Sequence, residues 1–579
     1  MLQTFRRRAS RIEAGVGFFQ GLEKPRVVFS KPWKLLARGG GLCRVMPHML
    51  TRFQIWSRRG AAILSGALLA TAFPPLDWSG VVFFALVPLL LVLRGESAGG
   101  AFRLGWLAGA TQWLVTVFWL HHVSWGGWVG LAFYCALYPG FFALIAAALW
   151  RGCGENRLGR FFLPPVLAVA WAGLEWIRGT FGTGFAWLPL AASQHLNLPL
   201  LQLAGWGGAY LVSALIVWLN VALAVTVCAY SVAPPEASPD LATHRTFRWG
   251  EASRRAVHTE LLFALVVLAV ALAYGWRVLR TPQDNSTLLK VALVQPAIPQ
   301  MDKWTPEMVE TIYNRLRELT KRARVESKSD LVIWPETAVP DDIRSSQASY
   351  DVVFGLVTNG TPILLGSTDT LYLDSGKARY FNSTFLFSTN GVIAGTYDKQ
   401  HLVAFGEYIP PLLGWLTPIE DSFTPGTTSF VFRLARPAVD FSTLICFEDT
   451  VAEVARGFVL AGARLLVNMS NDAWFDPSAA SHQHMLHSVL RAVENRVPVV
   501  RCCNTGVSCC IDRFGRVYDA VAAAQAVSGF QNTVVAVPDR TAPLTFFAQH
   551  GDWFGPGAAS VAGLLTLGAL WRRRKEGNN

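Results

Sequence analysis

The chain has 579 residues, too many for one ordinary domain, and 52% of them are hydrophobic while only 16% are charged. This balance excludes a wholly soluble or disordered protein, in which about a quarter of the residues normally carry charge. The net charge of +12 comes almost entirely from residues 1–60, which hold 13 Lys/Arg and 2 Asp/Glu. The remainder is nearly neutral, so the basicity does not predict a nucleic-acid-binding surface.

Residues 1–55 are predicted to be a basic N-terminal extension, either disordered or upstream of a true start at Met46 or Met49. A secretory signal peptide fits poorly, because no short apolar stretch here ends in a cleavage site of small residues.

Apolar segments of roughly bilayer length come next, since a helix needs about 20 apolar residues to cross the hydrocarbon core. About eight are expected: 60–77, 80–94 (a short one), 104–121, 127–149, 161–178, 199–229, 258–276 and 556–571. Residues 56–280 are therefore predicted to form a seven-span transmembrane bundle, and 556–571 a final transmembrane helix. The basic residues follow the even-numbered spans, which predicts cytoplasmic termini and places residues 280–555 across the membrane.

Residues 288–538 alternate short apolar runs with polar helical stretches. The expected strands are 289–295, 331–334, 362–366, 442–445 and 465–468, and the expected helices are 304–324 and 482–496. Such alternation is typical of an α/β layered domain. In folds of this kind, functional residues gather just beyond the ends of strands.

Three residues of this block carry complementary chemistry: Glu336, Lys399 and Cys446. A thiol with a pKa of about 8.5 needs a base to accept its proton and a cation to hold developing charge. Glu336 is the candidate base and Lys399 the candidate cation. Each residue alone has an ordinary explanation, namely a turn glutamate, a solvated surface lysine and a structural cysteine.

Taken together, these residues resemble the nitrilase, or carbon–nitrogen hydrolase, superfamily, whose sites use Glu, Lys and Cys in this order. Phe405–Pro410, with its Glu407, resembles the segment after the family's lysine, and Asn471–Phe475 resembles one beyond its cysteine. Set among several spans, with Glu175–Gly179 and Thr183–Trp187 in the bundle, the block is similar to the bacterial apolipoprotein N-acyltransferase family. Phe447 and Ala186 depart from that pattern, where Tyr and Pro are usual.

The resemblance implies a multi-span α-helical bundle of about eight helices carrying an αββα, nitrilase-like domain at 288–538. It implies that Cys446 takes an acyl group from a membrane phospholipid as a thioester, then passes it to the α-amine of a diacylglyceryl apolipoprotein. It further implies the bacterial inner membrane with a periplasmic catalytic domain, and no cofactor, metal or nucleic acid. The supporting residues it suggests are Glu407, Glu448, Trp304 and Asn382.

Two other functions remain open from the sequence. A membrane-tethered amidase would let water resolve the acyl-enzyme, although the apolar surroundings of Phe405, Trp415 and Phe423 favour lipid. A transporter or receptor with a nitrilase-like sensor would need charged residues deep in the spans, and few are present. The cysteines in Cys502–Cys503 and Cys509–Cys510 are expected to be small buried hydrophobes, with a disulfide or a metal site as alternatives.

Overall fold

The computed structural model describes residues 42–153, 157–231, 258–281, 285–358, 360–374, 377–410, 422–475, 477–520 and 527–576. Most of the predicted basic extension, the loop at 232–257 and Trp415 lie outside these residues. The chain divides into two compact units, Met1–Trp56 and Ser57–Asn579. The second unit holds both the helical bundle and the α/β domain.

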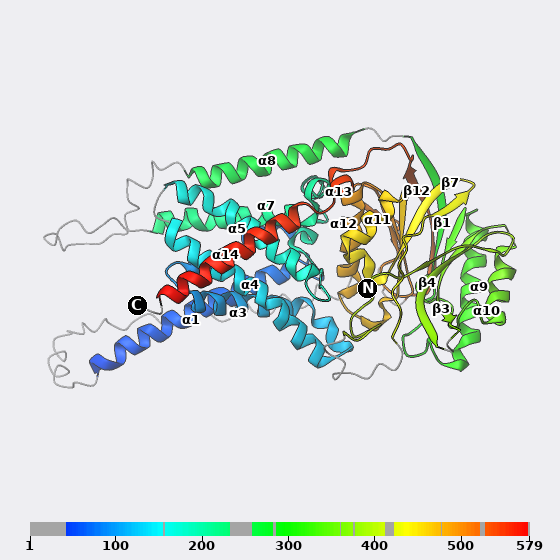
Figure 1. The fold of residues 1–579 in the computed structure, drawn as a ribbon, viewed down its shortest axis with the longest axis horizontal. Coiled ribbons are helices and arrows are strands. Elements are labelled where there is room, and N and C mark those ends of the chain that lie inside the picture. The colour runs from blue at the N-terminus through cyan, green and yellow to red at the C-terminus, as the bar shows by residue number, and fades with distance from the viewer. Residues whose placement is uncertain are drawn as a thin grey trace, which may run out of the picture. The chain divides into compact units, whose positions relative to one another are not determined.

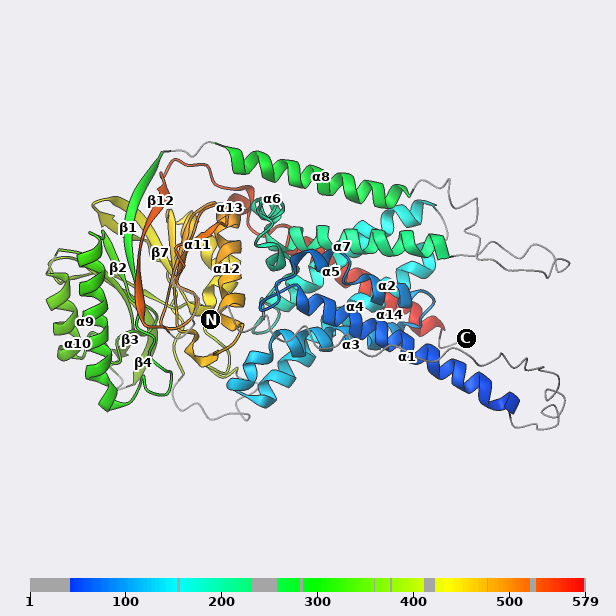
Figure 2. The same ribbon diagram turned by 180° about the vertical axis from the view of Figure 1, so that it is seen from behind.

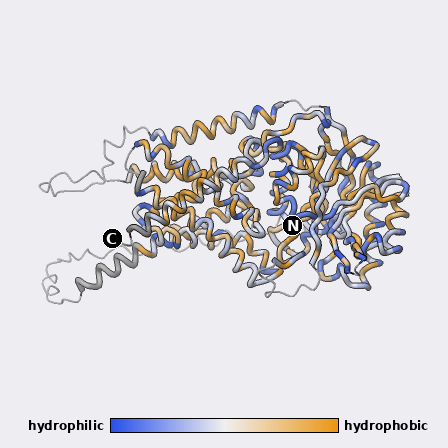
Figure 3. The backbone as a smooth tube through the Cα atoms, in the orientation of Figure 1, coloured by the Kyte–Doolittle hydropathy of each residue, from blue (hydrophilic) through white to orange (hydrophobic). Residues whose placement is uncertain are grey.

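Hydrophobic helices form the bundle (Figure 3). The long helices are α1 (Leu42–Thr71), α3 (Ala98–Thr116), α4 (Trp125–Cys153), α5 (Arg157–Thr180), α7 (Ala204–Ser231), α8 (Thr259–Arg280) and α14 (Phe554–Glu576). Shorter pieces are η1 (Ser79–Phe83), α2 (Val87–Leu93), η2 (Phe118–His122), η3 (Leu190–Gln194), α6 (Leu198–Leu201) and α13 (Phe546–His550). The bundle is therefore a set of long helices joined by short helical turns.

The expected count of about eight spans is not reproduced. Within the described residues, five helices are long and apolar enough to cross a membrane: Trp125–Arg151, Arg157–Thr180, Ala204–Ala229, Thr259–Arg280 and Phe554–Trp571. The expected second span is broken into η1 and α2, so it is too short to cross as one helix. The expected third span ends at Thr116, since η2 follows, and the expected sixth span contains two helices, α6 and α7.

Two sheets, each of six strands in the described residues, form the α/β domain (Figures 1 and 2). The first has the order β12-β1-β2-β3-β4-β5 and the second β11-β10-β9-β8-β7-β6. The first sheet's strands are β1 (Ser286–Gln295), β2 (Leu331–Ile333), β3 (Ile363–Tyr372), β4 (Ala378–Phe387), β5 (Ile393–Asp398) and β12 (Gly529–Pro538). The second sheet's are β6 (Phe432–Ala435), β7 (Ala438–Ile445), β8 (Leu465–Ser470), β9 (Val499–Cys503), β10 (Cys509–Ile511) and β11 (Val517–Tyr518).

The central strands of each sheet are parallel: β1–β2–β3 in one and β7–β8–β9 in the other. Both sets read as near-continuous buried apolar runs, as strands covered on both faces must. Helices α9 (Val309–Glu326) and α10 (Gln347–Val357) cover the first sheet, and α11 (Ala452–Leu460) and α12 (Ala480–Asn495) cover the second (Figure 1). The result is the expected αββα sandwich.

The two sheets face each other directly. The hydroxyls of Thr384 on β4 and Thr443 on β7 lie 2.8 Å apart, and the Cys502 thiol on β9 donates to the carbonyl of Ile333 on β2. On the far side of the second sheet, α12 packs against α7 of the bundle. The residues that follow β2, β5 and β7 come together where these strands end.

Close helix packing in the bundle depends on small residues, as membrane helix interfaces generally do. A methyl group built on Gly173 of α5 would lie 2.2 Å from the Ala558 carbonyl oxygen of α14. Gly563, also on α14, has no atom within 4 Å of that position. The two glycines therefore offer a matched pair.

We expect Gly173→Ala to lower the thermal unfolding midpoint of the detergent-solubilised protein, because overpacking typically costs about 1–3 kcal/mol. Gly563→Ala should leave the midpoint unchanged or raise it slightly. Equal midpoints for the two variants would show that α5 and α14 do not pack this closely.

Candidate active site

The structure brings Glu336, Lys399 and Cys446 together, each just beyond the end of a strand. Glu336 follows β2, Lys399 follows β5, and Cys446 follows β7 as the first residue of the turn η7 (Cys446–Thr450). The Lys399 Nζ atom lies 3.8 Å from Glu336 Oε1, and both side chains are buried. The charges of Glu336 and Lys399 both act on the thiol of Cys446.

The backbone of Cys446 turns sharply between strand and helix. Its φ of +52° lies in the left-handed region, which costs a residue with a β-carbon roughly 1–2 kcal/mol. The Cys446 carbonyl oxygen accepts a hydrogen bond of 2.9 Å from Asn468 Nδ2 and lies 3.3 Å from His484 Nε2. Strain held in place by surrounding contacts is typical of functional positions.

Glu448 ties the lysine and cysteine segments together through backbone groups. Its Oε1 atom accepts from the Tyr397 hydroxyl at 2.8 Å, and from the backbone N–H groups of Gln400 at 2.7 Å and His401 at 3.1 Å. Its Oε2 atom accepts from the N–H of Ile445 at 2.8 Å. Glu448 therefore fixes the residues on either side of Lys399 to the residue before Cys446.

Glu407 and Asn382 complete a polar network with Glu336 and Lys399. Lys399 Nζ donates to Glu407 at 2.9 Å, and Asn382 Nδ2 donates to Glu336 Oε1 at 2.8 Å and to Glu407 Oε1 at 2.9 Å. The backbone N–H of Val403 donates to Glu407 Oε2 at 2.8 Å. Asn382 thus separates two carboxylates that would otherwise repel each other.

This network determines which groups are charged. Burial disfavours the ammonium of Lys399, but Glu407 and Glu336 outweigh burial and raise its pKa above the ordinary value. Burial also opposes the charge of Glu407, and Lys399 more than compensates, so the pKa of Glu407 is lowered. The Lys399–Glu407 pair is therefore ionised at neutral pH.

The thiol of Cys446 behaves in the opposite way. Burial and the negative charge of Glu336 together raise its pKa well above the ordinary value, although Lys399 acts to lower it. The resting site consequently holds a protonated thiol, and Glu336 is the carboxylate whose negative charge acts on it most strongly.

A second ammonium group, Lys303, was missed by sequence reasoning. Its Nζ atom donates to the Glu336 carbonyl oxygen at 3.1 Å and to the Thr337 hydroxyl at 2.6 Å. Burial lowers the pKa of Lys303 to about 8. The only signal in the sequence was its place beside Trp304, whose half-exposed indole lies 5.9 Å from Lys303 Nζ.

Aromatic rings connect the bundle to the residue after the nucleophile. The Trp187 ring lies parallel to that of Phe447, with an interplanar angle of 4° and centroids 6.2 Å apart. Phe447 also stacks on His401 at 6.1 Å and on Phe185 at 6.5 Å. The phenylalanine that replaces the usual tyrosine therefore contributes a ring face at this position.

Gln483 on α12 is the main polar connection between the α/β domain and the bundle. Its Oε1 atom accepts hydrogen bonds of 3.0 Å from the indole N–H groups of Trp119 and Trp187. Its Nε2 atom donates to the carbonyl oxygens of Pro74 and Thr116, also at 3.0 Å. The amide thus uses its full hydrogen-bonding capacity on three separate segments of the bundle.

The next residue, His484, belongs to a buried charged cluster behind Cys446. Its Nδ1 atom lies 2.9 Å from Asp472, and its Nε2 atom lies 3.1 Å from Asp449. Arg501 Nη1 lies 2.7 Å from Asp449 Oδ2. Although burial disfavours the imidazolium, Asp449 and Asp472 raise the pKa of His484 to about 9.

The neighbouring candidates have structural roles. Asp472 accepts from the Ser470 hydroxyl at 2.8 Å, and Asn471 accepts from Asn504 Nδ2 at 2.8 Å, so both shape loops beside the site. The thiols of the cysteine-rich region are free and buried, as their expected role as small hydrophobes requires: Cys502, Cys503, Cys509 and Cys510.

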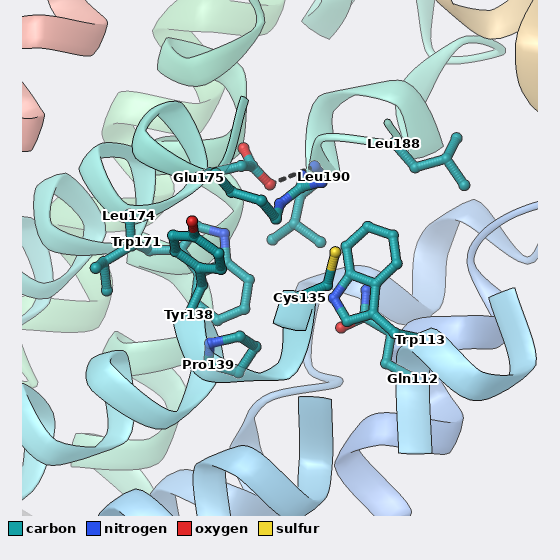
Figure 4. A pocket seen from close by; sticks show the side chains of 11 residues that line it. Gln112, Trp113, Cys135, Tyr138, Pro139, Trp171, Leu174, Glu175, Leu188 and Leu190 are labelled. Atoms are coloured by element: carbon teal, nitrogen blue, oxygen red, sulfur yellow. Dashed lines mark hydrogen bonds between the residues drawn. The ribbon is translucent and has the colours of Figure 1, made fainter. Parts of the chain in front are cut away.

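Glu175 and Arg178 do not pair with each other among the described residues, although their spacing allowed it. Glu175 Oε1 accepts from the N–H of Leu190 at 2.9 Å, beside a small cavity of about 20 Å³ in the bundle (Figure 4). Arg178 donates to the carbonyl oxygens of Phe185 and Trp187, each at 2.8 Å. Both side chains therefore hold the segment that carries Trp187 toward the site.

The fold and these residues define a membrane protein with a carbon–nitrogen hydrolase domain. Residues 290–536 match the family model described as carbon-nitrogen hydrolase, and residues 65–222 match the one described as apolipoprotein N-acyltransferase N-terminal domain. The chain belongs to the apolipoprotein N-acyltransferase family.

Two curated relatives carry this assignment. An apolipoprotein N-acyltransferase of Geobacter metallireducens is 34% identical over 89% of this chain and 95% of its own length. One of Gloeobacter violaceus is 32% identical over 87% of this chain and 92% of its own. Among solved structures, a mutant of Nesterenkonia AN1 amidase from the nitrilase superfamily covers 46% of this chain and 95% of its own, at 15% identity and a TM-score of 0.35.

The raised pKa of His484 predicts a pH-dependent stability. The charged imidazole of His484 stabilises the folded state fully below its ordinary pKa of about 6.5. This contribution to the unfolding free energy is lost as the pH rises through about 9. We therefore expect the wild type to lose on the order of 3 kcal/mol of unfolding free energy relative to His484→Gln between pH 6.5 and 9.5. Denaturant unfolding at the two pH values measures this difference.

His550→Gln is the control for this measurement, because His550 is exposed and bonded only locally, to the Phe546 carbonyl. It should keep the wild-type pH dependence. Lys303 titrates in the same window in all three proteins and cancels in the comparison. Parallel curves for wild type and His484→Gln would mean that this histidine is neutral in the folded state.

Proposed function

We propose that this protein transfers a fatty acyl group from a membrane phospholipid to the N-terminal α-amine of a diacylglyceryl apolipoprotein. The observation that carries the proposal is the grouping of Glu336, Lys399 and Cys446 in a buried site that contacts a membrane bundle of this family. Thiol, base and cation are the parts that acyl transfer through a thioester needs.

In the first step, Glu336 takes the proton of Cys446 as the sulfur attacks the ester carbonyl of the phospholipid. Lys399 stabilises the negative charge that develops on the carbonyl oxygen. The carbon–oxygen bond then breaks, and Glu336 returns the proton to the departing lysophospholipid. The acyl group remains on Cys446 as a thioester.

In the second step, the α-amine of the apolipoprotein attacks the thioester carbon. Glu336 accepts a proton from the amine, the carbon–sulfur bond breaks, and the proton returns to the sulfur of Cys446. The product is an amide, and the free thiol is restored. Both substrates are membrane-anchored, so a site fixed to a bundle meets them at high effective concentration.

Supporting roles follow from the contacts. Glu407 and Asn382 keep Lys399 charged and Glu336 in place, and Glu448 sets the spacing between the lysine and cysteine segments. Trp304, half-exposed at the start of the helical region after β1, remains a candidate for contact with the acyl chain. The steps proposed above are written with the side chains of this protein alone.

The location we propose is the bacterial inner membrane, with residues 288–538 on the periplasmic side. This orientation is supported by the basic residues that follow the even-numbered predicted spans, because Lys and Arg are enriched in cytoplasmic loops. Arg245, Arg248, Arg254 and Arg255, which contribute to it, lie outside the described residues, as do the side chains of Arg572–Lys575.

An amidase that hydrolyses a small amide is the alternative. The aromatic stack of Trp187, Phe447 and His401, and the family of the chain, favour a lipid substrate. The two reactions differ in what releases the acyl group, which is an amine in one and water in the other.

We expect wild-type protein incubated with phospholipid to gain the mass of one acyl group, because the donor half-reaction stops at the thioester when no amine is present. Hydroxylamine should remove the adduct, and so should a diacylglyceryl-cysteine peptide. Cys446→Ala should gain no mass, while Cys228→Ala, which alters a half-buried thiol of α7, should behave as wild type. Intact-protein mass spectrometry makes the measurement.

Two outcomes would contradict the proposal. An adduct that persists in Cys446→Ala would place the acyl group on another residue. A folded wild type that forms no adduct with phospholipid, yet hydrolyses small amides, would favour the amidase.

A further inference from the structure

A groove separate from the Glu336–Lys399–Cys446 site lies between α8, α6 and the turn that joins β10 to β11. It encloses about 520 Å³. Its walls are mainly apolar, with Leu198 and Pro199 on α6 facing Leu272 and Trp276 on α8. Two guanidinium groups, those of Arg280 and Arg516, also line it.

The groove lies beside a close backbone contact between α8 and α6, and α8 also packs against α7 and α5 of the bundle. A methyl group built on Gly275 would lie 1.7 Å from the Pro199 carbonyl oxygen, so the two backbones meet there. Only 17% of the most apolar window of α8 is buried within the chain, and the helix runs along the edge of the bundle (Figures 1 and 2). A groove at this helix therefore opens toward the lipid.

The charged end of the groove lies at the end of the apolar helix α8, where we expect a membrane helix to meet the lipid headgroups. Arg280 is the last residue of α8, and β1 of the α/β domain begins at Ser286. The guanidinium carbon of Arg280 lies 5.7 Å from the Trp276 ring centroid. Tryptophan and arginine at a helix end are the usual anchors at the membrane–water boundary.

Several guanidinium groups gather at this end of the groove. Arg516, Arg513 and Arg496 all lie over the Phe514 ring, with their guanidinium carbons 5.2–5.4 Å from its centroid. Asp512 forms a 2.9 Å ion pair with Arg516. In the described part of the chain, Arg280 forms no ion pair.

We propose that this groove binds one membrane glycerophospholipid, whose phosphate is held between Arg280 and Arg516 and whose acyl chain lies between α8 and α6. Guanidinium groups bind phosphate in bidentate fashion, and the apolar walls match a chain rather than a free anion. This lipid is bound and not consumed, since the groove contains neither Cys446 nor its partners. It fills the gap on the lipid-facing side of α8 and links that helix to the α/β domain.

The test uses full-length protein in mild detergent and a phosphatidylglycerol with a photoactivatable group in one acyl chain. After illumination, peptides from 196–199 and 272–279 should carry the label in the wild type. Labelling of these peptides should fall at least fivefold in the Arg280→Gln/Arg516→Gln double variant. Arg277→Gln removes one positive charge from the same helix end as Arg280, outside the groove lining, and should label as wild type.

Competition identifies the part of the lipid that is recognised. Unlabelled phosphatidylglycerol should suppress labelling, while dioleoylglycerol and millimolar inorganic phosphate should not. If the double variant is labelled as strongly as the wild type, or if dioleoylglycerol suppresses labelling, the proposal is overturned. The groove would then bind acyl chains without recognising the phosphate. Suppression by inorganic phosphate would also overturn it, because the site would then be one for a free anion.

Label on peptides around Cys446 provides an internal reference that should be equal in all variants. If the peptides around Cys446 carry no label while the groove peptides do, phospholipid does not enter the acyl-transfer site. The groove proposal would still stand in that case. Thermal unfolding of the double variant should match that of Arg277→Gln in the absence of lipid, which separates loss of binding from loss of folding.

Discussion

The amide of Gln483 is the constraint on which the relation between bundle and site depends. It is buried, and each of its hydrogen bonds ends on a bundle segment: two indoles and two backbone carbonyls. A buried donor or acceptor left unpaired costs about 1–3 kcal/mol, so these segments cannot shift without a penalty at several groups at once. The adjacent residue, His484, contacts the carbonyl of Cys446. One turn of α12 therefore fixes the bundle and the nucleophile to each other.

The charge states in the site also follow from contacts between buried groups. Lys399 lies among Glu336, Glu407 and the Cys446 thiol, and it remains charged because two carboxylates offset its burial. The thiol remains protonated because burial and the negative charge of Glu336, the base in the proposed reaction, both disfavour the thiolate. Deprotonation is thus favourable only when an electrophile is present to take the electron pair. Such a site avoids holding a reactive thiolate when no substrate is bound.

Much of the α/β domain could be predicted from the sequence, since apolar runs such as 331–333 and 465–470 are buried parallel strands with a plain signature. The grouping of Glu336, Lys399 and Cys446 could be predicted too, because strand ends converge in layered folds. Lys303 and Gln483 could not, since their roles depend on contacts 34 and 364 residues away. The span count was not exact, because apolar composition does not reveal where a helix breaks, and the expected second span is broken into η1 and α2.

The fate of the acyl group is the remaining physical question for the proposed reaction, because a thioester near water hydrolyses. Phe447 lies between Trp187 of the bundle and His401 of the lysine segment, so ring faces border the residue that follows the nucleophile. Burial lowers the pKa of His401, which keeps that ring neutral and apolar in character. An aromatic border of this kind favours an acyl chain over water beside the thioester. The same hydrolase machinery can then deliver the acyl group to an amine, because the bundle supplies a surface that a soluble nitrilase domain lacks.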